Sequence, residues 1–131
     1  MRQTQFRQVV ILSAAREHLS AHENYDRSID LCNKLKVLGI TFDTAVGVYK
    51  DNVETSFVCL PKKGQLSTLI SLGLGTFNQD SVLIQRTNGN SYLLNKDLEQ
   101  KAIGRLKATP QVIAQKQENY TLLNDVYYVA S

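Results

Sequence analysis

Apolar and polar residues alternate along the segment 41–60 in two runs, which predicts a β-hairpin. A period of two places successive side chains on opposite faces of a strand. Asp51-Asn52 is a favourable two-residue hairpin loop, and this loop would set Tyr49 directly opposite Glu54, about 5 Å away. One hairpin face is apolar and predicts a core. Its residues are Phe42, Thr44, Val46, Val48, Val53, Thr55, Phe57 and Cys59.

The other face of the predicted hairpin carries Tyr49 and Glu54 among small and apolar residues, with Val58 and Leu60 farther along. This face is too apolar for open solvent and too polar for a dry core. We interpret it as a subunit interface or as the floor of a ligand site.

The segments around the hairpin complete a recognisable order of elements. They are a strand over 6–14, a helix from Asn24 or Asp26 to Gly39, a helix over 65–77, and strands over 81–86 and 91–94. This order predicts a ferredoxin-like split βαβ fold of the α+β class, an antiparallel sheet with two helices on one face. Extra C-terminal strands are expected at 103–107 and 120–129, around a mobile segment.

A sheet with both helices on one face leaves its second face bare, and a half-apolar bare face needs a partner. Several such domains could close their open faces together as a symmetric oligomer, with ligand sites in the crevices between subunits. The length of 131 residues predicts a single domain over 1–131, with a core over 6–95 and a C-terminal hairpin extension over 99–131.

Composition narrows the function classes. The net charge is +3 and the basic residues are scattered, which is not the pattern of a nucleic-acid-binding protein. We find no signal peptide and no apolar run near the roughly 20 residues of a membrane helix, so we expect no membrane association and a cytoplasmic location. Cys32 and Cys59 are expected to be buried free thiols. His18 and His22 lack a third ligand, so we expect no metal site.

Three groups of residues are candidates for a site. The first is Glu54 with Tyr49, for which the alternative is a surface ion pair between Lys50 and Glu54. The other two could equally be caps, loop contacts and an ordinary turn. They are a polar rim of Ser13, Arg16, Asn24 and Arg27, and the pair Gln79 and Asp80. Two loop-placed histidines make no catalytic triad, which argues against a nucleophilic hydrolase.

These residues, taken in order, resemble a family. The matching pieces are Ser13-Ala14 with Arg16 and Leu19, Asn24 with Arg27, Gly47-Val48-Tyr49-Lys50, Glu54, and Gln79-Asp80-Ser81-Val82-Leu83. Over about residues 8–95 the chain is similar to the phage-encoded S-adenosylmethionine (SAM) lyases, formerly called SAM hydrolases. The resemblance implies a trimer like the nitrogen-regulatory signalling proteins, with active sites between subunits. It also implies conversion of SAM to 5′-methylthioadenosine and homoserine lactone, which would deplete the methyl donor of an infected host and impede restriction.

The chemistry that the resemblance implies needs no protein nucleophile, metal or cofactor, because the sulfonium is a good leaving group and the substrate carboxylate can reach its own γ-carbon. We expect Glu54 to bind the α-ammonium group, Tyr49 to orient it, and Val58 and Leu60 to contact the adenosine. Ser13, Arg16, Asn24, Arg27, Gln79 and Asp80 are further predicted substrate-binding residues. Hydrolysis to homoserine with Glu54 as general base, a non-catalytic adenosine-binding signalling trimer, and a phage decoy protein are the alternatives. The net charge argues against the decoy.

Overall fold

The computed structural model describes residues 6–131, in which helices separate groups of consecutive strands. Residues 1–5 of the predicted domain lie outside the described residues. The elements in order are β1 (Val9–Ser13), α1 (Ala21–Val37), β2 (Thr41–Tyr49), β3 (Asn52–Leu60), α2 (Leu66–Ile70), the π-helix η1 (Ser71–Thr76), β4 (Ser81–Gln85), β5 (Asn90–Asn95), β6 (Gln100–Thr109), α3 (Gln111–Ala114), β7 (Asn119–Leu123) and β8 (Val126–Ala130).

The α1 helix begins earlier than predicted, because its N-terminus is fixed by a capping box. The Ser20 hydroxyl accepts a hydrogen bond from the Glu23 amide at 3.1 Å, and the Glu23 carboxylate accepts one from the Ser20 amide at 3.2 Å. This reciprocal pairing satisfies two amides that a helix N-terminus leaves free. Asn24 and Asp26, the predicted caps, therefore lie inside the helix. Gly39 follows the helix with φ of 69°, as its predicted role at the stop requires.

The turn between β2 and β3 lies at Lys50 and Asp51, one residue earlier than predicted. Both residues have positive φ, 47° and 67°, as a type I′ loop requires. The register therefore pairs Tyr49 with Asn52 and not with Glu54. Each β2 residue therefore pairs with a β3 residue two positions earlier than predicted. Because this shift is even, every side chain keeps its face, and Tyr49 and Glu54 remain on the same face as diagonal neighbours.

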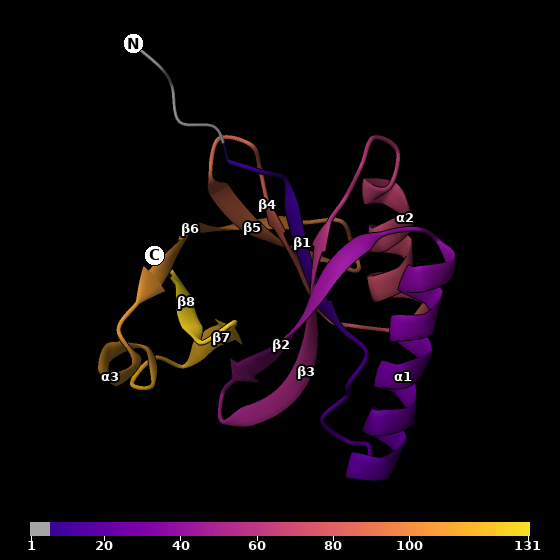
Figure 1. Ribbon diagram of the computed structural model, residues 1–131, viewed down its shortest axis with the longest axis horizontal. Coiled ribbons are helices and arrows are strands. Elements are labelled where there is room, and N and C mark those ends of the chain that lie inside the picture. Colours follow the sequence, from indigo (N-terminus) through magenta and orange to yellow (C-terminus); the bar gives the residue numbers. More distant parts are fainter. Residues whose placement is uncertain (1–5) are drawn as a thin grey trace.

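The predicted ferredoxin-like split βαβ sheet, with two helices on one face, is wrong. The eight strands form a closed antiparallel barrel in the order β1-β3-β2-β7-β8-β6-β5-β4, and β4 pairs with β1 (Figure 1). Closure depends on β7, which pairs with the edge of β2. The segment 120–129 is two strands, because Asn124 and Asp125 have positive φ and turn the chain back. The face expected to be bare is therefore the barrel interior, which removes that argument for a trimer.

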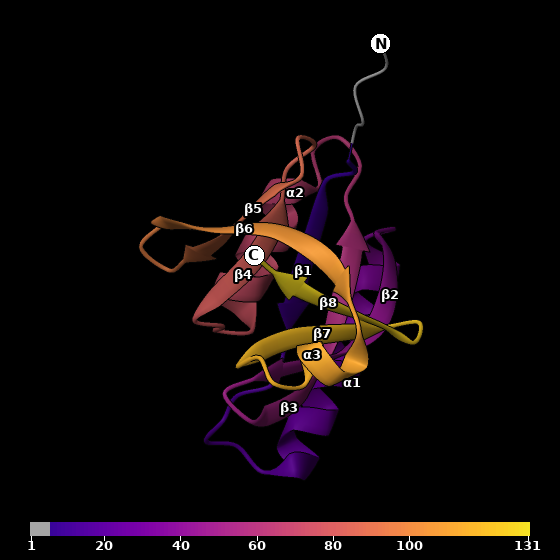
Figure 2. The ribbon, with the colours of Figure 1, turned by 90° about the vertical axis from the view of Figure 1, so that its left-hand side faces the viewer.

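The main hydrophobic core lies outside the barrel, between the strands and the helices. In Figure 1, α1 and α2 lie together on one side, whereas β6, β7, β8 and α3 lie on the other, and Figure 2 shows β6 and β8 crossing in front of β1. The buried core residues come from β1, β3, β4, β5, α1, α2, η1 and their connections. They are Val10, Leu12, Ala14, Leu31, Leu35, Ile40, Phe57, Cys59, Leu69, Leu72, Phe77, Val82, Ile84, Tyr92 and Leu94.

The predicted core face of the hairpin is buried only where helices cover it. Phe57 and Cys59 are buried, and burial raises the pKa of the Cys59 thiol to about 12. Val53 is 70% exposed and Val46 is also exposed, because they lie toward the hairpin tip.

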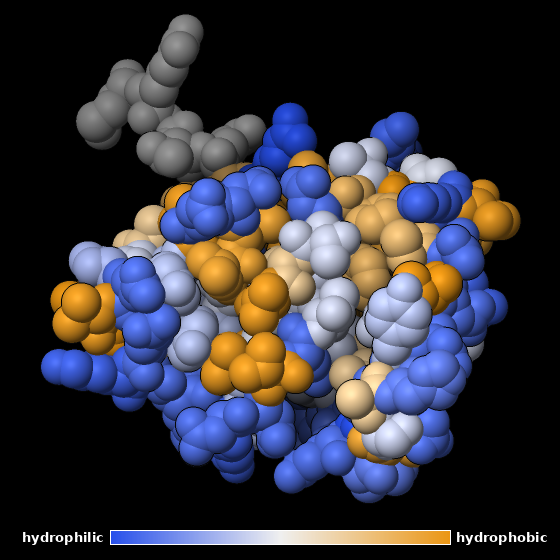
Figure 3. Space-filling view, turned by 60° about the horizontal axis from the view of Figure 1, so that its bottom comes forward, coloured by the Kyte–Doolittle hydropathy of each residue, from blue (hydrophilic) through white to orange (hydrophobic). Residues whose placement is uncertain are grey.

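The face seen in Figure 3 shows apolar side chains in separate groups among polar ones. Across residues 6–131, no helix combines the length and apolarity that crossing a bilayer would need.

Candidate functional site

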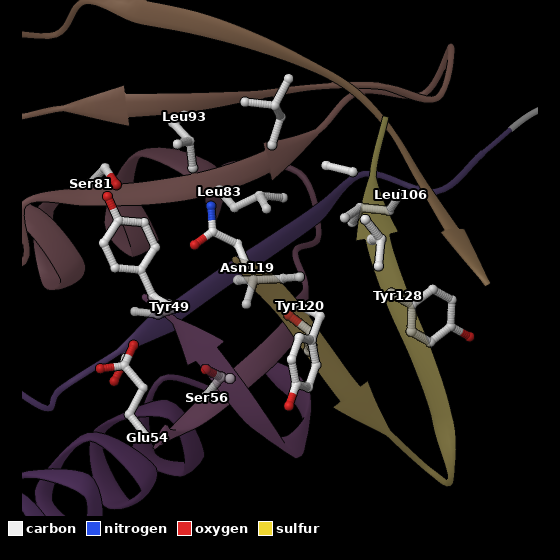
Figure 4. Close-up of a pocket in the computed structure, with 18 of the residues that line it drawn as sticks. Tyr49, Glu54, Ser56, Ser81, Leu83, Leu93, Leu106, Asn119, Tyr120 and Tyr128 are labelled. Carbon is white, nitrogen blue, oxygen red and sulfur yellow. The ribbon is translucent and has the colours of Figure 1, made fainter. Parts of the chain in front are cut away.

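The barrel encloses a cavity of about 460 Å³ that is lined by residues from all eight strands (Figure 4). The lining combines hydroxyls, two carboxylates and aliphatic side chains. Its residues are Ile11, Leu12, Ser13, Gly47, Tyr49, Glu54, Ser56, Gln79, Ser81, Leu83, Leu93, Ile103, Leu106, Gln117, Glu118, Asn119, Tyr120, Thr121, Tyr128, Val129 and Ala130. The volume falls within the roughly 300–1,000 Å³ of typical small-molecule sites.

Strand register arranges part of this lining in successive rows. The first is the carboxylate row, toward the hairpin tip, in which Gly47 pairs with both Glu54 and Thr121. The next row is the serine row, in which Ser13 on β1 pairs with Ser56 on β3. Ser81 on β4 belongs to this row as well. The pairing of β1 with β4 ends at Ile11 and Leu83. Ser13 lies two residues after Ile11 and Ser81 lies two residues before Leu83, so the same register sets the two serines opposite each other. The third row is the apolar row, Ile11, Leu83 and Leu93, which are paired across β1, β4 and β5.

Glu54 and Glu118 are the charged residues among those described as lining the cavity. Burial raises the pKa of Glu54 above its ordinary value, with a smaller opposing effect from the Ser13 hydroxyl. A buried carboxylate without a cation nearby loses hydration that nothing replaces. The cavity therefore has the electrostatics of a site for a cation.

Gly47 gives the Ser56 hydroxyl the space that it occupies, and Glu54 lies next to the same position. A Cβ atom at position 47 would lie 2.4 Å from the Ser56 hydroxyl oxygen and 3.7 Å from Cγ of Glu54. The first distance is shorter than any van der Waals contact. This close approach explains why the Gly-x-Tyr segment has glycine at position 47, since that residue lies directly beside the side chains of Ser56 and Glu54.

Tyr49 lies at the mouth of the cavity and is 51% exposed. Its ring points across the cavity toward the side of Ser81 in Figure 4, and the Lys50 ammonium lies 5.3 Å from the ring centroid. The Lys50 amide donates a hydrogen bond of 2.9 Å to the Glu118 carbonyl, which joins the hairpin tip to the segment before β7. This contact places Glu118 at the same mouth.

Ser13 and Gln79 are the residues of the predicted polar groups that line the cavity. The Ser13 hydroxyl donates to the Thr55 carbonyl at 2.9 Å and accepts from the Ala15 amide at 3.1 Å. The Gln79 amide nitrogen donates to the carbonyls of Ala15 and Phe77 at 3.1 and 3.3 Å. Both side chains therefore also fix the connection that follows β1.

The other predicted polar residues hold two connections together and do not line the cavity. The Arg16 main-chain amide donates a hydrogen bond of 2.8 Å to the side-chain oxygen of Asn24, and the side-chain amide of Asn24 donates one of 3.0 Å to the Arg16 carbonyl. Arg27 donates to the carbonyls of Ala14, at 2.6 Å, and of Phe77. Asp80 has a side chain that is 92% exposed and lies 3.6 Å from the Arg16 guanidinium.

Val58 and Leu60 share the strand face of Glu54 but lie outside the residues that line the cavity. The apolar lining comes instead from β1, β4, β5, β6 and β8, including residues after position 95 that sequence reasoning did not assign to the site. Ser56 was detectable, because it lies two residues after Glu54 on the same face. Within residues 6–131, His, Cys, Asp and Glu do not gather in threes as a metal site would require, and the absence of a metal stays a prediction.

The S-adenosylmethionine lyase family matches residues 10–131 of the chain. The chain belongs to this family. The sequence resemblance is thereby confirmed, and the match extends through the C-terminal strands that close the barrel. Membership makes SAM the small-molecule substrate and supports SAM lyase activity. A comparison with curated proteins found no significant match.

Proposed function

We propose that the protein cleaves SAM inside the barrel by attack of the substrate's own carboxylate on its γ-carbon. One carboxylate oxygen forms a bond to Cγ while the bond between Cγ and sulfur breaks. The electron pair of that bond neutralises the sulfonium. The products are 5′-methylthioadenosine and homoserine lactone, and no proton, metal or further reactant enters the balance.

The observation that carries this proposal is a half-buried carboxylate, Glu54, in a cavity without a cationic residue among its described lining. The α-ammonium group of SAM would supply the missing cation. The lack of a lining Arg or Lys within residues 6–131 is equally informative, because such a residue would bind the substrate carboxylate and weaken it as a nucleophile. The cavity therefore suits a substrate whose ammonium is held and whose carboxylate is free.

Glu54 is better assigned to the ammonium than to the sulfonium. The positive charge on sulfur disappears as the ring closes, so a strong contact to sulfur would stabilise the ground state more than the transition state. The ammonium keeps its charge throughout. Tyr49, a diagonal neighbour of Glu54 at the cavity mouth, would orient the same tail by a hydrogen bond.

Positioning would supply most of the rate. Oriented intramolecular reactions reach effective molarities of about 10⁵–10⁸ M, so a cavity that holds one folded conformer of the tail needs little further chemistry. Enclosure by eight strands also limits the access of water to the reacting carbon. The apolar row would contact the adenine ring.

Hydrolysis is the second candidate, and the raised pKa of Glu54 favours it. A carboxylate with such a pKa is suited to act as a general base toward water. In that reaction water would attack Cγ and give homoserine directly. The two reactions place oxygen from the solvent at different atoms of the product.

Cleavage in ¹⁸O-labelled water, followed by NMR and mass spectrometry, tests the proposal. Homoserine lactone formed first should carry no label, and its later opening should place ¹⁸O in the carboxyl group, because water attacks the acyl carbon. Label in the γ-hydroxyl group would instead establish hydrolysis. Binding of SAM without cleavage would favour the adenosine-sensing alternative and contradict both enzyme assignments.

The resemblance supports a role in phage counter-defence, in which the protein lowers SAM in the cytoplasm of an infected bacterium. Bacteria that express the protein should then lose SAM and gain methylthioadenosine, measurable in extracts.

A trimer with sites between subunits is supported by the resemblance alone, since one chain lines the cavity described above. Sedimentation of the purified protein tests the trimer, and turnover after exhaustive chelation tests the expected independence from metals and cofactors.

A further inference from the structure

We propose that Ser56 and Ser81 form a subsite for the ribose diol of the substrate, an inference that rests on the proposed function of the cavity. Both line the cavity in the serine row, on either side of Ser13. Ser56 is 5% exposed, and its hydroxyl lies in the space that Gly47 leaves open. The subsite thus lies on β3 and β4, the two strands that flank β1 in the barrel.

The hydrogen bonds of the three serines differ in a way that selects two of them. Ser13 donates to the Thr55 carbonyl and accepts from the Ala15 amide, so its single hydrogen is already used within the protein. Within residues 6–131, the hydroxyls of Ser56 and Ser81 have no such partners. A hydroxyl both donates and accepts. These two are therefore available to a ligand, whereas Ser13 maintains the end of β1.

The order of lining groups along the strands matches the order of chemical groups in the substrate. On β3, Glu54 is followed by Ser56 on the same face, and on β4, Ser81 is followed by Leu83. Passing from the carboxylate row to the apolar row therefore crosses the serine row. SAM runs from a cationic aminoalkyl tail through a neutral diol to an apolar purine.

Neutral hydroxyls are the appropriate partners for a diol. Each ribose hydroxyl needs one acceptor and can accept in turn, and a serine satisfies both needs without adding charge. A second carboxylate at this position would compete with Glu54 for the ammonium. The subsite would thereby fix the sugar and set the distance from the purine to the reacting tail.

A chemical double-mutant cycle tests this subsite without depending on turnover. The ligands are 5′-methylthioadenosine and its 2′-deoxy and 3′-deoxy analogues, titrated by calorimetry into the wild type, Ser56→Ala and Ser81→Ala. The control is Ser91→Ala, which removes a buried hydroxyl that lies outside the cavity lining and has no hydrogen-bond partner among the described residues. Thermal unfolding of each variant checks that the fold is kept.

Loss of one hydroxyl contact should weaken the binding of methylthioadenosine about 3- to 10-fold in each of the two variants and not in the control. The wild type should prefer the full ribose to a deoxyribose by a similar factor, and this preference should shrink when its serine partner is removed. A preference unchanged in both variants, or no binding to the wild type, would overturn the subsite.

The cycle also separates the subsite from the lyase proposal. Wild-type protein that cleaves SAM but shows no serine-dependent sugar preference would retain the lyase and lose the subsite. Wild-type protein with a serine-dependent preference that leaves SAM intact would retain the subsite and lose the lyase.

Discussion

Ser56 and Phe57 are neighbours on β3, yet they lie in opposite environments. The Phe57 ring packs outside the barrel against Phe42, with ring centroids 5.8 Å apart, in the core that the helices cover. Ser56 faces the hollow interior beside Glu54 and Gly47. The same alternation applies to β1 and β4, where Val10, Val82 and Ile84 are buried in the outer core and Ile11, Ser13, Ser81 and Leu83 line the cavity.

The two faces of the same strands therefore have different roles, the outer face in folding and the inner face in forming the site. The outer face has a helix layer and a continuous apolar core, so it supplies the free energy of folding. The inner face has a cavity, hydroxyls and a carboxylate whose pKa is raised by burial. Such a group does not stabilise the folded state in its ionised form, which is typical of a site kept for function.

The outer face can be tested by Phe57→Ala, which should lower the free energy of unfolding by about 3–5 kcal/mol through lost burial and the cavity left behind. Ser56→Ala should change it by less than about 1 kcal/mol, because that hydroxyl faces a cavity. Urea denaturation followed by circular dichroism measures both. Equal losses in the two variants would mean that the inner face is a packed core.

On the inner face, Glu54→Gln should reduce kcat/KM at least about 100-fold, because the substrate ammonium would lose its charged partner in a site with little water. Its stability at neutral pH should equal or exceed that of the wild type. The matched control is Glu99→Gln, an exposed residue outside the lining. Near-normal turnover in the first variant would refute the role of Glu54.

The pH dependence of the two faces should also differ. Because burial raises the pKa of Glu54, the folded chain holds this proton to higher pH than the unfolded chain. The stabilisation from the protonated form is therefore present at low pH and is lost as pH rises from 4.5 through the raised pKa. Activity should show the opposite trend, falling about tenfold per pH unit below that pKa.

Denaturation of the wild type and Glu54→Gln across this range measures the first effect, and the pH profile of kcat/KM measures the second. The stability difference between the two proteins should grow with pH, in favour of the variant. A constant difference would show that Glu54 titrates normally.

Gly47→Ala tests the steric support of the site. The new methyl group would meet the Ser56 hydroxyl at 2.4 Å, so Ser56 must shift, and it would touch Cγ of Glu54 at an ordinary contact distance of 3.7 Å. We expect a loss of about 1–3 kcal/mol in stability and about a tenfold loss of kcat/KM if the ammonium contact loosens. Adding Ser56→Ala removes the clashing oxygen and should recover part of the stability. A double variant no more stable than Gly47→Ala would contradict this steric account.

The smallest expected effect is at the cavity mouth. Glu118→Gln should raise KM for cationic SAM about 2- to 5-fold at low ionic strength with kcat unchanged, because an exposed carboxylate attracts the substrate over a distance that salt shortens. Steady-state kinetics across a salt series measures this, with Asp97→Asn as a control outside the lining. A change in kcat, or one independent of salt, would place Glu118 in direct contact with the reacting tail.

Local alternation in the sequence was sufficient to place Tyr49 and Glu54 on one face and Phe57 on the other. These inferences held although the turn lies one residue earlier, because the register shift is even. The helix and strand segments up to position 95 were likewise detectable from apolar spacing and from glycines.

Closure of the barrel was not detectable in this way, because it depends on β7 pairing with β2 across about 70 positions. No local pattern encodes such a pairing, and the turn at Asn124 and Asp125 was missed within a run of strand-forming residues. The cavity lining from β6, β7 and β8 was therefore missed as well. The roles of Arg16 and Arg27 depend on contacts with main-chain carbonyls, which residue types do not reveal.

A crystal structure of Glu54→Gln soaked with SAM would show where the substrate binds, since the variant should bind SAM weakly but leave it intact. We expect SAM inside the barrel, with its ammonium beside position 54, its ribose at Ser56 and Ser81, and its adenine against Leu83 and Leu93. SAM bound between subunits or on the outer surface, with the barrel interior empty, would contradict this expectation.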